Sequence, residues 1–373
     1  MREVGPDETD PADKTELVDE NPTDGIDGHA TDKTDPEPDI NREHLVTFKD
    51  IKNIEALHGL SNPERLHSKD GPSVQLWVEE MKKKKMNPVL FFKPQGEILP
   101  DCDLSADESF LVIMTATQKM MLQKFGSKVI SIDSTHGTNP YHFQLTTVLC
   151  IDEFGVGYPV AFCVSSTVDT STMELFFRHI KSAVGEIRTK IIMTDDTNIY
   201  SNAWTNVMGA PEKKLLCAWH VLRNWKSNLC KIAGDKQLKD EVFKFLKLII
   251  HEKDSSIFES LIEDFVKKLS ADKRTQLFGA YFMKTYCGRK EIWAYCFREY
   301  GQLTTNNHIE AMHNTLKNVY MEGRIVRRLD KCVHLLLKLA RDRWYSRITN
   351  KSKGARTSRV NAAHVRHKRS RNM

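Results

Sequence analysis

Three carboxylates in this chain have the surroundings that a divalent-metal site requires. Asp133 ends an apolar run at residues 129–132, and Asp195 ends another at residues 191–193. Each is therefore expected at the C-terminal end of a strand, the edge where ligands of open α/β sheets gather. Glu310 lies on a later stretch with helical spacing. Together they would supply the hard oxygen ligands that Mg²⁺ or Mn²⁺ prefers, and two such ions support in-line displacement at a phosphodiester.

Each carboxylate also has a plainer explanation. An Asp at a strand end is often only a turn residue or a helix cap. Glu310 alone is typical of a first helical turn, where a negative charge favours the helix dipole. Asp196 is a neighbouring alternative to Asp195, but successive strand residues point to opposite faces, so only one can face a metal while the strand lasts. The order of the carboxylates along the chain favours the metal site.

Short β-rich runs alternate with helical runs around these residues, which predicts an α/β sheet. The predicted strands cover residues 89–94, 109–116, 128–133, 143–152, 160–166, 190–196 and 214–221. Helices are expected at 117–126, closed by Gly126, at 171–185, with Ser171 or Thr172 as N-cap, and at 198–209.

The second half of the chain is predicted to be mainly helical. Apolar positions recur at helical spacing through residues 222–300, before the helix that carries Glu310. Thr305 or Asn306 is expected to cap that helix, and a basic amphipathic helix covers 325–348. The predicted divisions are a disordered acidic N-terminus (1–43), a helical and β lead-in module (44–124), a catalytic core (125–221), a helical insertion (222–300), the last catalytic helix with the basic helix (301–349) and a disordered basic tail (350–373).

The two ends of the chain carry opposite charge. Residues 1–40 hold 14 Asp/Glu and 3 Lys/Arg, a net charge of −11, so the remainder carries +5 + 11 = +16. Residues 324–373 hold 16 Lys/Arg and 2 Asp, a net charge of +14. A basic end of this kind suits a polyanion such as nucleic acid, although a solvated, disordered end explains it equally well.

Composition weighs against a membrane or secreted protein. No apolar run reaches the roughly 18 residues of a membrane-spanning helix, and the first ten residues lack the apolar centre of a signal peptide. The eight cysteines form no C-x-x-C pair, which favours reduced thiols and an intracellular compartment.

Four runs carry a resemblance to a known family. They are ISIDSTHGTNPYHFQLTTVLCIDEFGVGYPVAFCVSS (130–166), IIMTDD (191–196), LLCAWHVLRNW (215–225) and TTNNHIEAMHNTLK (304–317). In this order they resemble the transposase domain of Mutator-like elements (MULE), which also occurs in plant far-red-response transcription factors. The resemblance is strong over about 125–320. It implies an RNase H-like α/β fold, a mixed sheet with flanking helices and an all-helical insertion before the last catalytic helix.

The resemblance also implies site residues. The family's DDE triad falls on Asp133, Asp195 and Glu310, which would bind two Mg²⁺ or Mn²⁺ ions. Its C-x-x-H motif falls on Cys217 and His220, expected close to the catalytic centre as DNA-contacting or ligand-orienting residues.

The C-x-x-H pair also has a purely structural explanation, in which the Cys is packed in the core and the His is hydrogen-bonded. Two ligands alone do not close a tetrahedron, so no structural zinc is expected. Arg223 is a candidate for contact with a DNA phosphate, and its alternative role is a surface ion pair. Asp196 is a candidate neighbour of the site. His136 is a weaker candidate for the same site. Trp204, Trp219 and Trp225 are candidates for stacking on extruded bases, with core packing as the more common role.

The function implied is that of a DDE-type DNA transposase, which cleaves phosphodiester bonds at element ends and transfers the freed strand to target DNA. The alternative is a transposase-derived DNA-binding regulator without catalysis. The expected partners are double-stranded DNA, both terminal repeats and target, and a second copy of the chain, with no membrane. The basic run HKRSR (367–371) and the substrate suggest the nucleus. The cysteine patterns of the zinc modules that family members usually carry are not visible in the sequence.

Overall fold

The computed structural model describes residues 50–51, 53–54, 64–100, 102–298 and 306–354. The chain divides into two compact units, residues 1–61 and 62–373, and all the elements below belong to the second. The predicted disorder of residues 1–43 lies outside the described residues, as do most of the predicted basic tail and the cap candidate Thr305.

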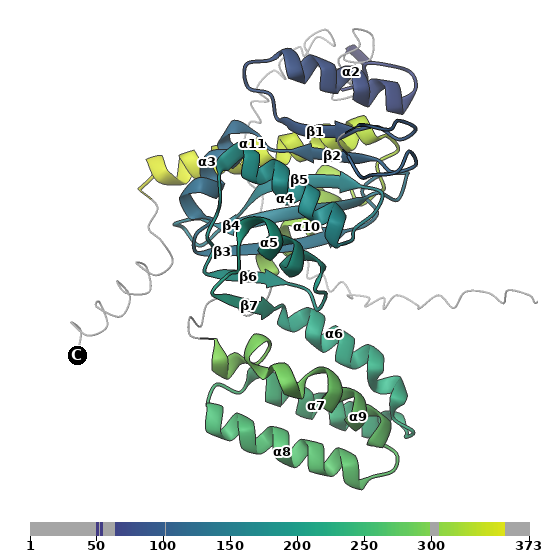
Figure 1. The fold of residues 1–373 in the computed structure, drawn as a ribbon, viewed down its shortest axis with the longest axis vertical. Coiled ribbons are helices and arrows are strands. Elements are labelled where there is room, and N and C mark those ends of the chain that lie inside the picture. The colour runs from purple at the N-terminus through teal and green to yellow at the C-terminus, as the bar shows by residue number, and fades with distance from the viewer. Residues whose placement is uncertain (1–49, 52, 55–63, 101, 299–305, 355–373) are drawn as a thin grey trace, which may run out of the picture. The chain divides into compact units, whose positions relative to one another are not determined.

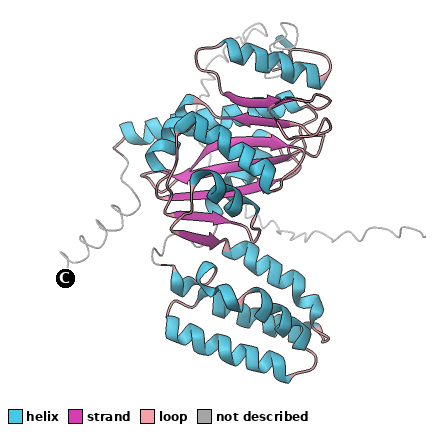
Figure 2. Ribbon diagram, viewed as in Figure 1, coloured by secondary structure: helices cyan, strands magenta, loops and turns pink. Residues whose placement is uncertain are grey.

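A seven-stranded mixed sheet forms the centre of the second unit (Figures 1 and 2). The strands β3, β6 and β7 run parallel to one another, and the remaining neighbours pair antiparallel. β1 and β2 fall in the predicted lead-in module and extend the sheet beyond β5. In spatial order the strands are β1 (Val89–Lys93), β2 (Phe110–Ile113), β5 (Gly157–Ser165), β4 (Gln144–Ile151), β3 (Val129–Thr135), β6 (Ile191–Thr194) and β7 (Lys213–Leu216).

Helices cover both faces of the sheet. On one face lie α3 (Ala116–Phe125), α4 (Thr170–Val184) and α5 (Ile199–Met208), packed on a core that includes Ile132 and Val148. On the other lie α2 (Asp70–Lys83), α10 (Asn307–Thr315) and α11 (Leu329–Ser352), packed on a core that includes Leu149. Consecutive residues of β4 serve opposite cores, as the alternation of side chains along a strand requires. The predicted α/β class, a mixed sheet with flanking helices, is confirmed.

Between β7 and α10 the chain forms a set of helices with a core of its own (Figure 1). The rings of Trp225 and Trp293 are at its centre, with centroids 5.3 Å apart, and both side chains are fully buried. The four longer helices are α6 (Ala218–Asn228), α7 (Lys236–His251), α8 (Ser255–Ala271) and α9 (Gln276–Thr285), followed by the 3₁₀ turns Cys287–Ile292 and Tyr295–Phe297.

Several boundaries differ from the prediction. The strand predicted at 214–221 ends at Leu216, because Cys217 is the N-cap of α6 and the following residues are helical. The N-cap of α4 is Asp169 rather than the predicted Ser171 or Thr172. Its Oδ1 accepts a hydrogen bond from the Thr172 backbone N–H at 2.8 Å. Asn306 is the N-cap of α10, but its side chain makes no capping hydrogen bond. α11 continues to Ser352, so the first residues of the predicted tail are helical.

The other predicted strands are present with shifted ends: β3 continues to Thr135, two residues beyond the predicted end at Asp133, and β5 begins at Gly157, three residues before the predicted start. α3 ends at Gly126, as expected for residues 117–126. In the part of the chain that the structure describes, no helix combines the length and apolar character that crossing a membrane requires.

Candidate active site

The first two carboxylates are brought together by the pairing of β3 with β6. These strands are parallel, and the last paired residues are Ser131 and Met193. Continuing the same register by two residues sets Asp133, two residues before the end of β3, beside Asp195, which directly follows β6. Because neighbouring strands lie about 4.8 Å apart, the two carboxylates belong to one site.

The same geometry extends to Cys217 on the next strand. β6 and β7 are also parallel, and their last pair is Thr194 with Leu216. One further step in register sets Asp195 beside Cys217, whose backbone N–H donates to the Thr194 carbonyl at 2.9 Å. A row of Asp133, Asp195 and Cys217 therefore crosses the ends of three parallel strands.

The Asp133 side chain faces the layer that contains α10. Its neighbour Ile132 packs into the core of the opposite face, and alternate strand residues point to opposite sides. Asp133 is only 8% exposed, and its Oδ2 lies 3.6 Å from Nδ1 of His313. The other ring nitrogen of His313 is 3.2 Å from Oγ1 of Thr147 on β4. The imidazole is thereby fixed between strand and carboxylate, and it orients Asp133.

Asp195 is held by the turn that follows β6. Its Oδ1 accepts hydrogen bonds from the backbone N–H of Thr197 at 3.2 Å and from the Thr197 hydroxyl at 2.9 Å. Burial raises the pKa of Asp195, and the negative charge of Asp133 raises it further, against the effect of these hydrogen bonds. The charge of Asp133 therefore adds to the cost of ionising the desolvated Asp195. A hard divalent cation would remove this penalty, so the donor set fits Mg²⁺ or Mn²⁺.

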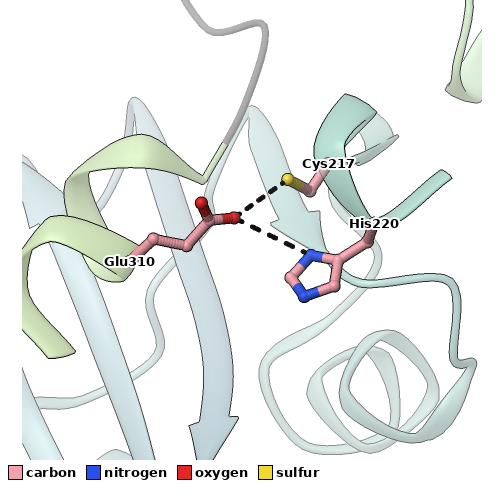
Figure 3. Close-up of side chains that lie close together, drawn as sticks. All are labelled: Cys217, His220 and Glu310. Atoms are coloured by element: carbon pink, nitrogen blue, oxygen red, sulfur yellow. Dashed lines mark hydrogen bonds and ion pairs between the residues drawn. The ribbon is translucent and has the colours of Figure 1, made fainter. Parts of the chain in front are cut away.

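Glu310 reaches the row from α10, near its Cys217 end (Figure 3). Its Oε1 lies 3.4 Å from Sγ of Cys217 and 3.9 Å from Nδ1 of His220. His220 sits in the first turn of α6 because Cys217 is the N-cap of that helix. One short helix therefore contacts both ends of the row, through His313 at Asp133 and through Glu310 at Cys217.

The ligating atoms of Cys217, His220 and Glu310 all lie within 4.8 Å of one another, the one group of three so close among the residues described. The three carboxylates form a wider set. Two-metal sites hold their ions about 3.5–4 Å apart, so their ligands span more than a single coordination sphere.

Asp196 points away from this site and binds the helical insertion. Its Oδ1 forms an ion pair with Nη1 of Arg289 at 2.7 Å. Its Oδ2 accepts hydrogen bonds from the Tyr286 hydroxyl at 2.6 Å and from Nδ2 of Asn224 at 3.3 Å. With its oxygens engaged in this way, Asp196 is a structural link, and Asp195 is the carboxylate of the pair that faces Asp133.

The remaining candidates from the sequence lie around the site. Arg223 stacks over the ring of Trp219, with its guanidinium carbon 5.2 Å from the ring centroid. Trp219 is 45% exposed, whereas Trp204 and Trp225 are fully buried and serve as core residues. His136 is exposed just beyond β3.

Two residues near Asp133 were missed from the sequence. His313 lies three positions after Glu310, and Lys317 lies seven positions after Glu310. Helical spacing therefore sets all three on one side of the helix. Lys317 lies in the π-helical turn Leu316–Tyr320 that continues α10. Burial lowers the pKa of Lys317, and the charge of Asp133 opposes this effect. The spacing was a usable signal for both.

Comparison with known proteins supports the fold. A family model for the RNaseH-like domain of zinc finger SWIM domain-containing protein 1/3 matches residues 95–201. The matched segment contains both Asp133 and Asp195 and ends before Cys217. No curated protein matches the chain. The resemblance to Mutator-like transposases stays a prediction, while the seven-stranded mixed sheet, its flanking helices and this match together identify an α/β fold of the RNase H-like kind.

Proposed function

We propose that this protein is a metal-dependent DNA-cleaving and strand-transferring enzyme of the DDE transposase type. The observation that carries the proposal is the strand register, which sets Asp133 beside Asp195 at the C-terminal edge of the sheet. Glu310 approaches the same edge from α10. The resemblance to Mutator-like transposases supports the same roles.

In this proposal the three carboxylates would hold two divalent ions. When bound, these ions would supply activation of a water molecule or a 3′-hydroxyl and stabilisation of the leaving oxygen of the phosphodiester. His313 holds the Asp133 carboxylate in position, and the Thr197 hydrogen bonds hold that of Asp195. Lys317 adds a positive charge near Asp133, where a DNA phosphate would lie. Hydrolysis of the strand frees a 3′-hydroxyl, and attack of that hydroxyl on target DNA completes transfer. The proposed substrate and the basic run 367–371 lead us to propose a nuclear location.

Cleavage of an element-end duplex tests the proposal. Asp133→Asn, Asp195→Asn and Glu310→Gln should each abolish nicking in Mg²⁺ or Mn²⁺. DNA affinity should stay equal or increase, because a negative charge near phosphate is removed. The substrate is a labelled duplex with the terminal repeats that flank the coding locus, assayed on a denaturing gel.

Matched controls come from α8, where Glu263 and Asp264 are both exposed. Glu263→Gln and Asp264→Asn make the same chemical changes and should leave cleavage unchanged. If the unaltered chain binds the duplex but cleaves no end substrate in either metal, the catalytic proposal fails. A transposase-derived DNA-binding regulator would then be the better description.

A further inference from the structure

The cluster of Cys217, His220 and Glu310 has a composition that phosphodiester chemistry with Mg²⁺ does not need. A thiol, an imidazole and a carboxylate meet at one point (Figure 3). The C-x-x-H spacing supplies only two of these groups, which is the reason that no structural zinc is expected from the sequence. Helix α10, more than 80 residues later, adds a third ligand.

Two of the three separations within the cluster are close to those of tetrahedral coordination. With Zn–S of about 2.3 Å and Zn–N and Zn–O of about 2.1 Å, a tetrahedral ion sets S and O about 3.6 Å apart and N and O about 3.4 Å apart. The corresponding separations are 3.4 Å, from Cys217 Sγ to Glu310 Oε1, and 3.9 Å, from His220 Nδ1 to Glu310 Oε1. Small side-chain movements would reach the coordinated geometry.

One buried polar atom of the cluster lacks a hydrogen-bond partner. It is Nδ1 of His220. Buried polar atoms are almost always paired, so an orphan of this kind calls for an explanation such as an ion. An imidazole nitrogen directed at a thiol and a carboxylate is a typical metal-ligand arrangement.

We propose that Cys217, His220 and Glu310 bind a Zn²⁺ ion and leave its fourth coordination position open. Soft thiolate and imidazole ligands favour Zn²⁺ over Mg²⁺. Three protein ligands with one free position are typical of catalytic zinc sites rather than structural ones. The open position would accept water or a phosphate oxygen.

Binding is coupled to the release of one proton. In the metal-free protein the Cys217 thiol donates a hydrogen bond to Oε1 of Glu310 at 3.4 Å. Coordination replaces the S–H bond with a Zn–S bond, and the proton leaves to solvent.

The inference rests on the proposed function in one respect, since Glu310 belongs both to the zinc cluster and to the proposed carboxylate triad. Because Asp195 stands beside Cys217 in the strand register, the zinc would lie next to the all-oxygen position at Asp133 and Asp195. Glu310 would bridge a soft and a hard ion. The alternative is a purely structural cluster, in which Sγ of Cys217 accepts the Asn306 backbone N–H at 3.2 Å and no ion binds.

Cobalt substitution distinguishes these arrangements. The full chain is stripped with a chelator and titrated with Co²⁺, which reports thiolate coordination through a sulfur-to-cobalt charge-transfer band and tetrahedral geometry through intense visible bands. We expect one tightly bound equivalent that Zn²⁺ displaces. Cys217→Ser should remove the charge-transfer band. His220→Gln should weaken Co²⁺ binding by more than about 100-fold, beyond the 10–100-fold that residues behind the ligands typically cost.

Two controls complete the test. Cys230→Ser removes an exposed thiol and should leave the band intact. Asp133→Asn should also keep the band while abolishing cleavage, which separates failure of the zinc site from failure of the proposed catalysis. Absence of the band in the folded, unaltered chain overturns the inference, and so does a band that survives Cys217→Ser.

Discussion

Asp195 shows how a single side chain is held in an unfavourable state before any ion binds. It is desolvated, and the charge of Asp133 adds to the penalty for ionisation. A group whose pKa is raised by folding stabilises the fold below its unfolded pKa and loses that contribution as pH increases through the folded value. For the metal-free protein, Asp195 therefore contributes less stability near neutral pH than it does at acidic pH.

Asp195→Asn should consequently stabilise the metal-free chain while abolishing cleavage. We expect the free energy of unfolding near pH 7 to increase by about 0.5–2 kcal/mol, the usual gain when a strained site is relieved. The difference should vanish below about pH 4, where the carboxyl is protonated even when unfolded. Urea unfolding in EDTA across this pH range measures it, with Asp264→Asn as the neutral control. A variant less stable than the unaltered chain at pH 7 would contradict this account.

Trp219 is the one tryptophan of the three candidates that remains available to DNA. It is 45% exposed, stands one position before His220 and carries the Arg223 guanidinium over its ring. Trp219→Ala should weaken binding of a duplex with an unpaired end by about 1–3 kcal/mol, the typical value of one base–aromatic stack. Fluorescence anisotropy measures the affinity, and Trp219→Phe should recover part of it. If the unaltered chain, Trp219→Ala and Trp219→Phe bind the duplex with equal affinity, the Trp219 ring does not stack on a base.

At the scale of elements, the strands that carry Asp133 and Asp195 could be predicted because a mainly apolar run leads to each carboxylate. The predicted end of the first strand was two residues early, since β3 continues past Asp133 to Thr135 and still pairs with β4 there. The boundary at Cys217 could not be predicted. Residues 214–221 look like one apolar strand, but the chain turns at Cys217, where the thiol packs against Glu310. That contact comes from a helix distant in sequence, and no local pattern records it. His313 was missed for a different reason, since its spacing from Glu310 was visible but only the fold reveals its partner.

The joint between the sheet and the helical insertion depends on Asp196. Removing this carboxylate leaves Arg289 without its ion pair and the buried Tyr286 hydroxyl without its acceptor. Asp196→Ala should lower the free energy of unfolding by about 2–3 kcal/mol, less than the 3–5 kcal/mol of a fully buried pair. The discount reflects the 28% exposure of the Arg289 side chain. Urea midpoints at neutral pH provide the measurement. Asp195→Asn should shift the urea midpoint in the opposite direction. A shift in the same direction would contradict the assignment of Asp196 as the structural link and Asp195 as the site carboxylate.

At the scale of the whole molecule, the two ends of the chain carry opposite charge, and under the proposed function they would act differently on DNA. Residues 355–373 contain six Lys/Arg, and residues 1–40 carry a net charge of −11. The proposed substrate is a polyanion, so the basic end adds counterion release to binding, and the acidic end opposes it.

Deleting residues 355–373 should therefore weaken DNA binding in a salt-dependent way. If all six cations contact phosphate, the slope of log affinity against log salt should become less negative by up to about 5. Deleting residues 1–40 should leave the affinity unchanged or increase it. Titrations at several salt concentrations compare the two. An unchanged slope after removal of residues 355–373 would show that residues before 355 supply the phosphate contacts.

The position of α10 in the chain has a consequence for the order in which the protein becomes active. Glu310 follows Asp195 by 310 − 195 = 115 residues, and the helical insertion lies between them. A chain emerging from the ribosome holds two carboxylates long before the third is synthesised. Under the proposed function, no cleavage begins until the insertion has folded and α10 has docked. If the proposed function is correct, the topology would delay DNA cleavage until synthesis of the fold is almost complete.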